Sequence, residues 1–82
     1  MITIRYFGLL RELLQCHEET LAWSGQDSHE LLQQLRARGD DWANALSEQN
    51  VFRIVLNHQV IEEPTAIPDG SEVAFLPPVT GG

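Results

Sequence analysis

The last residues of the chain carry the group with the clearest chemical use. The sequence ends Pro77-Pro78-Val79-Thr80-Gly81-Gly82. Proline has no backbone N–H to donate, so two prolines stop strand pairing, and we expect the residues after them to project as an extended arm. Four extended residues reach about 13 to 14 Å, at roughly 3.3 to 3.6 Å each. Because glycine has no Cβ, such an arm can enter a narrow active site and leave the carboxylate of Gly82 open to attack.

A carboxylate is a poor electrophile until a leaving group is attached, so this arm suits activation of Gly82 by a partner enzyme. A diglycine ending is weak evidence alone, since at a glycine usage of ~7% about one chain in two hundred ends this way by chance. The alternative is an ordinary frayed terminus. The combination of a small β-rich domain, a strand ending in Phe75-Leu76, two prolines and two final glycines favours the chemical role.

The rest of the sequence offers no competing catalytic arrangement. It has no glycine-rich phosphate loop and no Ser-His-Asp or Cys-His pattern. The pairs Glu18-Glu19 and Glu62-Glu63 are typical of solvated faces or turns. Cys16 has no cationic neighbour except His17, so no stabilised thiolate is expected. One cysteine and three scattered histidines provide no clustered ligands, so we expect no metal site.

Composition limits the class of protein and its partners. With 82 residues, 43% of them hydrophobic, residues 1–82 are expected to form one domain, of which 77–82 are the extended tail. A net charge of -7 disfavours nucleic acid and anionic membrane and favours a basic protein surface. We expect no signal peptide or transmembrane helix, and therefore a cytoplasmic protein. All five basic side chains are arginines, so this domain cannot be joined to itself through lysine ε-amino groups.

Hydrophobic periodicity predicts an α+β fold. The predicted strands are Ile2–Phe7, Glu18–Trp23, Phe52–Leu56 as a central strand, Gln59–Ile61 and Glu72–Leu76. A short helix is predicted over Leu9–Leu14, with leucines on one side. The main helix begins at a cap on Asp27 or Ser28 and stops at Gly39, and one or two helical turns follow at Asp41–Leu46. Turns are predicted at Asn57-His58 and Pro68-Asp69-Gly70. The apolar first and last strands should lie mid-sheet, with the main helix across one face.

Two segments closely resemble the sulfur-carrier subunits of molybdopterin synthase. They are Ile4-Arg5-Tyr6-Phe7-Gly8-Leu9-Leu10-Arg11-Glu12-Leu13 and Asp69-Gly70-Ser71-Glu72-Val73-Ala74-Phe75-Leu76-Pro77-Pro78-Val79-Thr80-Gly81-Gly82. The resemblance implies a ubiquitin-like β-grasp fold, a mixed sheet with one main helix packed across it and a flexible diglycine tail. It also implies a cycle in which Gly82 is adenylated, converted to a thiocarboxylate, and used to donate sulfur to cyclic pyranopterin monophosphate, forming the molybdopterin dithiolene.

The resemblance implies roles for partners and for individual residues. Gly82 would carry the adenylate and then the sulfur, while Gly81, Thr80 and Val79 thread the partners' active sites. Candidate contacts with the large subunit are Phe7, Phe75, Pro77 and Pro78, although Phe7 and Phe75 could equally be core residues. The large subunit would supply the catalytic residues, so the chain is not an enzyme alone and binds no cofactor. A separate activating enzyme would use ATP, and the synthase would be a heterotetramer.

Two other functions share the activation step and differ in the acceptor. One is a ubiquitin-like protein modifier that forms isopeptide bonds through Gly82. The other is a sulfur carrier for another thiolated product such as thiamine. The Pro77-Pro78-Val79-Thr80 segment resembles the molybdopterin branch and disfavours the thiamine alternative.

Overall fold

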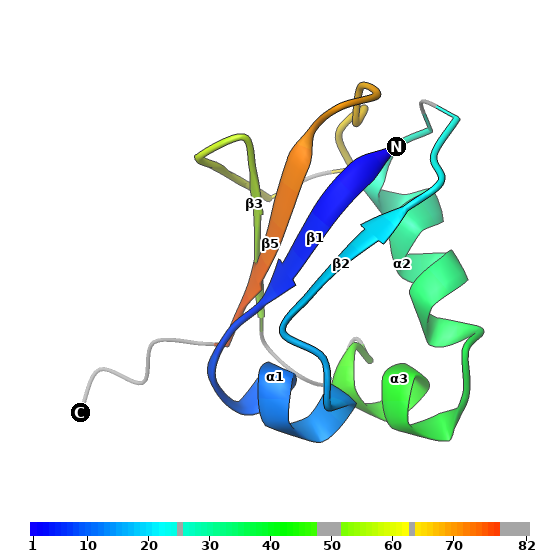
Figure 1. The fold of residues 1–82 in the computed structure, drawn as a ribbon, viewed down its shortest axis with the longest axis vertical. Coiled ribbons are helices and arrows are strands. Elements are labelled where there is room, and N and C mark those ends of the chain that lie inside the picture. The colour runs from blue at the N-terminus through cyan, green and yellow to red at the C-terminus, as the bar shows by residue number, and fades with distance from the viewer. Residues whose placement is uncertain (25, 48–51, 63, 78–82) are drawn as a thin grey trace.

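The fold is built on a five-stranded sheet, seen in a computed structural model that describes residues 1–24, 26–47, 52–62 and 64–77 (Figure 1). The strands are β1 (Ile2–Tyr6), β2 (Glu18–Leu21), β3 (Arg53–Leu56), β4 (Gln59–Ile61) and β5 (Glu72–Leu76). Their spatial order is β2-β1-β5-β3-β4. β1 and β5 are parallel, and the other neighbours are antiparallel. The predicted mid-sheet position of the first and last strands is therefore confirmed.

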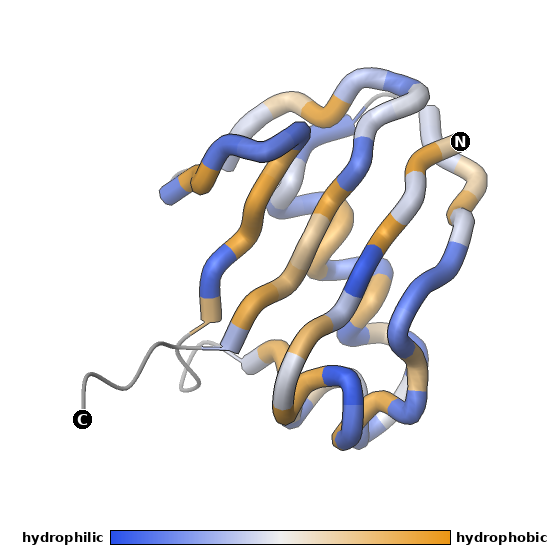
Figure 2. Tube along the Cα trace, turned by 60° about the vertical axis from the view of Figure 1, so that its left-hand side comes forward, coloured by the Kyte–Doolittle hydropathy of each residue, from blue (hydrophilic) through white to orange (hydrophobic). Residues whose placement is uncertain are grey.

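One face of the central strands is buried, and the other, which we call the open face, is exposed to solvent. Ile2, Ile4 and Tyr6 of β1 are at most 1% exposed, while Arg5 between them points to solvent. Phe75 of β5 lies on the same buried face. Along β1 in Figure 2, hydrophobic and polar residues alternate, as the two-residue repeat of side-chain direction in a strand requires.

Three helices cover the buried face and one end of the sheet. They are α1 (Gly8–Leu14), α2 (Ser28–Arg36) and α3 (Asp40–Ala45). α2 packs across the sheet through Leu31 and Leu35, both fully buried. α1 and α3 pack side by side at the end of the sheet where β1 and β5 finish (Figure 1). The mixed sheet with a main helix across it is the ubiquitin-like β-grasp fold that was predicted.

The predicted start of α2 is confirmed, and its predicted stop is wrong. The Asp27 carboxylate caps the helix by accepting a hydrogen bond from the backbone N–H of Glu30 at 2.9 Å. The helix ends at Arg36, before Gly39. Ala37 remains right-handed, so no left-handed glycine is needed there, and Gly39 is instead the N-cap of α3 with φ 152°.

The other element boundaries differ from the sequence predictions in small ways. β2 ends at Leu21, two residues early, and Phe52 precedes β3. β3 is an interior strand between β5 and β4, but Leu56 is its only buried residue, at 9% exposure. Among the described residues, no helix is long and apolar enough to cross a bilayer.

Candidate functional site

The candidate site is the place where the tail leaves the domain, which we call the tail root. Because β1 and β5 are parallel, their carboxyl ends meet at the same edge of the sheet. The backbone N–H of Phe7 donates to the carbonyl oxygen of Phe75 at 3.1 Å, which extends the pairing to the last residue before α1. Pro77 follows β5 directly and is partly buried. The predicted roles of 78–82 concern residues outside the described part of the chain.

Pro77 is seated against the first residue of α1. Gly8 has φ +59°, a left-handed conformation that favours glycine. A Cβ on Gly8 would lie 2.6 Å from Cγ of Pro77, so the missing side chain is what admits the proline ring. The sequence predictions give Gly8 no role of its own, since its contact with the tail root depends on the parallel pairing of β1 and β5.

The structure separates the two phenylalanines that the sequence treated alike. Phe75 is 0% exposed and stacks on Tyr6, with ring centroids 5.6 Å apart. Its side chain therefore belongs to the core and presents no surface to a partner, because strand alternation turns it inward. Phe7 is 41% exposed and remains able to make an intermolecular contact.

Phe7 borders a hollow on the open face of the sheet. The hollow has a volume of about 150 Å³ and is lined by Arg5, Phe7, Val55, His58, Glu72 and Ala74. Arg5 bridges two carboxylates there, with its Nε 2.8 Å from Glu18 Oε1 and 3.1 Å from Glu72 Oε1. The surface beside the tail root thus has a small apolar floor and a charged border.

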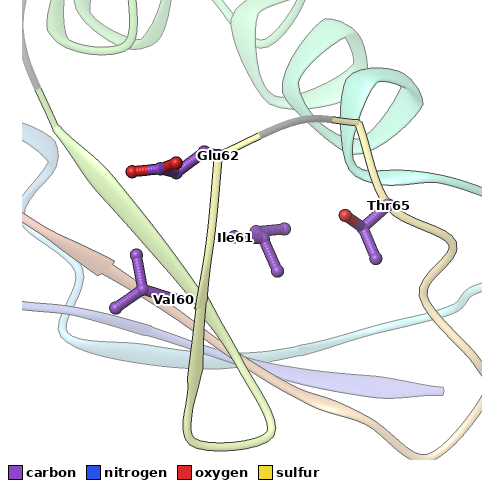
Figure 3. Close-up of a pocket in the computed structure, with 4 residues that line it drawn as sticks. All are labelled: Val60, Ile61, Glu62 and Thr65. Atoms are coloured by element: carbon purple, nitrogen blue, oxygen red, sulfur yellow. The ribbon is translucent and has the colours of Figure 1, made fainter.

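A second, broader hollow lies at the outer edge of β4. Its volume is about 380 Å³, and Val60, Ile61, Glu62 and Thr65 line it. In Figure 3 the side chains of Ile61 and Thr65 lie on facing sides of the gap between β4 and the segment that follows it. Two strands separate β4 from β1 and the Phe7 that follows it, so this hollow is not part of the tail root.

A partly buried polar cluster fixes β1 and β2 to the connection between α2 and α3. The carboxylate of Glu19 accepts a hydrogen bond from the Tyr6 hydroxyl at 2.8 Å and two from the Arg38 guanidinium at 2.7 Å each. Arg38 also lies over the Trp42 ring, 4.5 Å from its centroid. The bonds from Arg38 hold the pKa of Glu19 below its ordinary value. Burial, followed by the contact with Glu19, raises the pKa of Tyr6.

Cys16 lies beside this cluster and is partly buried. Its Sγ is 3.9 Å from Oε2 of Glu19. Tertiary structure also brings the Arg38 guanidinium close to Cys16. This cation, which the sequence did not lead us to expect there, lowers the pKa of the thiol. Burial and the Glu19 carboxylate outweigh that effect and raise the pKa of the thiol. Within the described ranges, no group of three His, Cys, Asp or Glu residues could hold a metal ion.

Comparison with known proteins places the chain in a family. The model of the ThiS family matches residues 4–82. The chain belongs to the ThiS family. Two curated relatives match over all 82 residues and over their own full lengths, one from Escherichia coli (strain K12) at 35% identity and one from Haemophilus influenzae (strain ATCC 51907 / DSM 11121 / KW20 / Rd) at 32%. Both are named "Molybdopterin synthase sulfur carrier subunit".

Solved structures share the fold of this ThiS-family chain at lower sequence identity. The crystal structure of SAMP1 from Haloferax volcanii matches with a TM-score of 0.75 and 19% identity, covering 99% of this chain and 98% of that one. The solution structure of small archaeal modifier protein 1 from Methanosarcina acetivorans matches with a TM-score of 0.75 and 24% identity, covering 99% and 95%. At these identities the likeness establishes the β-grasp fold alone.

Proposed function

We propose that this chain is the sulfur-carrier subunit of molybdopterin synthase and that the carboxylate of Gly82 is its working group. The observation that carries the proposal is the full-length similarity, at 35% and 32% identity, to two proteins of that name. The geometry of the tail root supports it, because β5 brings the chain to the edge of the sheet at Pro77, directly before residues 78–82.

The proposed cycle activates and then uses one carboxyl group. A carboxylate oxygen of Gly82 attacks the α-phosphorus of ATP on an activating enzyme, and pyrophosphate leaves. A sulfur nucleophile then attacks the acyl carbon and AMP leaves; if that nucleophile is a persulfide, a second thiol cleaves the S–S bond to free the thiocarboxylate. On the large subunit the thiocarboxylate sulfur is transferred to cyclic pyranopterin monophosphate, and water restores the carboxylate. The catalytic groups come from the partners.

This chain contributes positioning rather than acid–base chemistry. The hydrogen bond from Phe7 to Phe75 and the seat of Pro77 on Gly8 fix where the tail starts. From Pro77, five extended residues can reach at most about 17 to 18 Å. We propose that Phe7, Pro77 and Pro78 contact the large subunit and that Val79, Thr80 and Gly81 occupy its channel. The complete synthase would be a cytoplasmic heterotetramer.

Intact mass spectrometry tests the proposal. The chain is incubated with ATP, a sulfur source and an extract of its host, beside a variant that lacks Gly82. A mass increase equal to the replacement of one oxygen by sulfur, seen only with the complete tail, is the expected result. Covalent adducts with other proteins would favour the modifier alternative, and the absence of both products would refute a carboxyl-activation role.

A further inference from the structure

We propose that the outward face of α1, centred on Leu9 and Leu13, is a docking surface for the large synthase subunit. The inference rests on the proposed function and adds to it a surface outside the tail and the open sheet face. The two leucines are four residues apart on one helix, so they stand one above the other and form a short apolar ridge.

The ridge is exposed although the sequence pattern grouped it with the buried side of α1. Leu10 and Leu14 are 6% and 7% exposed and hold the helix on the core. Leu9 and Leu13 are 60% and 51% exposed. Including Phe7, three of the five large hydrophobic residues that are exposed in the described part of the chain fall in this seven-residue stretch. Such clustering indicates a contact surface, whereas scattered single residues would not.

The ridge borders a hollow that could receive a partner's side chain. The hollow has a volume of about 280 Å³ and lies between α1 and α3, lined by Leu13, Asp41, Asn44 and Ala45. Hollows of this kind accept the buried anchor residues that dominate binding energy in protein interfaces. Asp40 and Asp41 in the first turn of α3 make its border acidic. The complementary surface would have an apolar centre and a basic rim.

The position of α1 brings it close to any protein whose active site receives Gly82. α1 starts at Gly8, which contacts Pro77 at the tail root. A protein whose active site receives Gly82 must come within about 17 to 18 Å of Pro77. A standard interface of ~800 Å² per partner corresponds to a disc of roughly 16 Å radius, so it would extend over α1.

Charge and area favour the large subunit over other occupants. A second copy is disfavoured, because each chain carries a net charge of -7 and the ridge itself has an acidic border. A stable contact between subunits has an apolar core inside a more polar rim. The hollow on the open sheet face offers mainly Phe7, Val55 and Ala74 inside a charged border. Phe7 lines that hollow and directly precedes α1, so Leu9 and Leu13 would add apolar area to the same interface.

The test compares two binding partners of the full-length chain. Affinity for the purified large subunit is measured by calorimetry for the wild type, the double variant Leu9→Ser/Leu13→Ser, and a matched Leu9→Met/Leu13→Met control that keeps the surface apolar. We expect about 30- to 100-fold weaker binding for the serine variant and less than about threefold change for the methionine variant. Pyrophosphate release with the activating enzyme is measured in parallel and should stay within about twofold of the wild type.

Each other outcome has a defined meaning. If the wild type binds the large subunit and the serine variant binds equally well, the docking surface is wrong and the proposed function stands. If serine substitution slows pyrophosphate release and leaves large-subunit affinity intact, the ridge serves the activating enzyme and our assignment is overturned. If the wild type itself does not bind, the proposed function fails. If the double variant unfolds at a clearly lower temperature than the wild type, the single variant Leu13→Ser provides the same test. We expect it to bind the large subunit about five- to tenfold more weakly.

Discussion

Replacing Glu19, a partly buried carboxylate, with alanine should destabilise the domain more than the loss of an exposed carboxylate would. The change removes the acceptor of three hydrogen bonds, one from the Tyr6 hydroxyl and two from Arg38. Tyr6 is 1% exposed, so its unpaired hydroxyl costs about 1 to 3 kcal/mol. The Arg38 side chain is 30% exposed and can be rehydrated, so the lost ion pair adds only about 0.5 to 1 kcal/mol.

The expected total is about 1.5 to 4 kcal/mol, against a stability of roughly 4 to 12 kcal/mol for a chain of this length. The melting temperature should fall by about 6 to 30 °C. Urea denaturation at pH 7 measures the change, and Glu18→Ala is the matched control. Glu18 adjoins Glu19 on β2, is exposed, and pairs with Arg5 at the surface, so its loss should cost less than about 1 kcal/mol. Equal destabilisation by the two variants would refute the reasoning.

The wild type and Glu19→Ala should also differ in how their free energy of unfolding depends on pH. The pKa of Glu19 lies below its ordinary value of 4.5 when the chain is folded, because Arg38 donates to the carboxylate. The unfolded state therefore binds this proton first as pH falls, and the stabilisation is present above about pH 4.5 and lost below it. The difference in unfolding free energy between wild type and Glu19→Ala should be constant from pH 6 to 8 and shrink in acid. A difference that persists undiminished at pH 2 to 3 would argue against an ionic origin.

Three further predictions concern other parts of the fold. Asp27→Ala removes the cap of α2 and should cost about 0.5 to 2 kcal/mol by urea denaturation, whereas Asp27→Asn should retain most of it. His58 has φ 73° in the β3–β4 turn, so His58→Gly should raise the melting temperature by a few degrees; a decrease would contradict the strain assigned to this turn. The raised pKa of Cys16 should make its alkylation by iodoacetamide slow at pH 8, and Glu19→Gln should speed it by lowering that pKa; an unchanged rate would exclude the carboxylate as a cause.

Most of the secondary structure could be predicted from the sequence because local signals agreed with the final fold. Alternation in β1 predicted both its strand character and its buried face. The Asp27 cap marked the start of α2 from residue type alone. The predicted stop of α2 at Gly39 was wrong, because a glycine near a helix end is compatible with either the end of that helix or the start of the next one.

The sequence alone therefore predicted the α+β class, a single domain, the resemblance to sulfur carriers and the candidate carboxylate on Gly82, since all of these depend on residue type and local spacing. Tertiary structure decided which residues can act together. It placed Phe75 in the core and left Phe7 exposed, seated Pro77 on Gly8, and separated the leucines of α1 into a buried pair and an exposed pair. Those outcomes depend on strand pairing and helix packing between residues far apart in the chain, which periodicity within one segment does not encode.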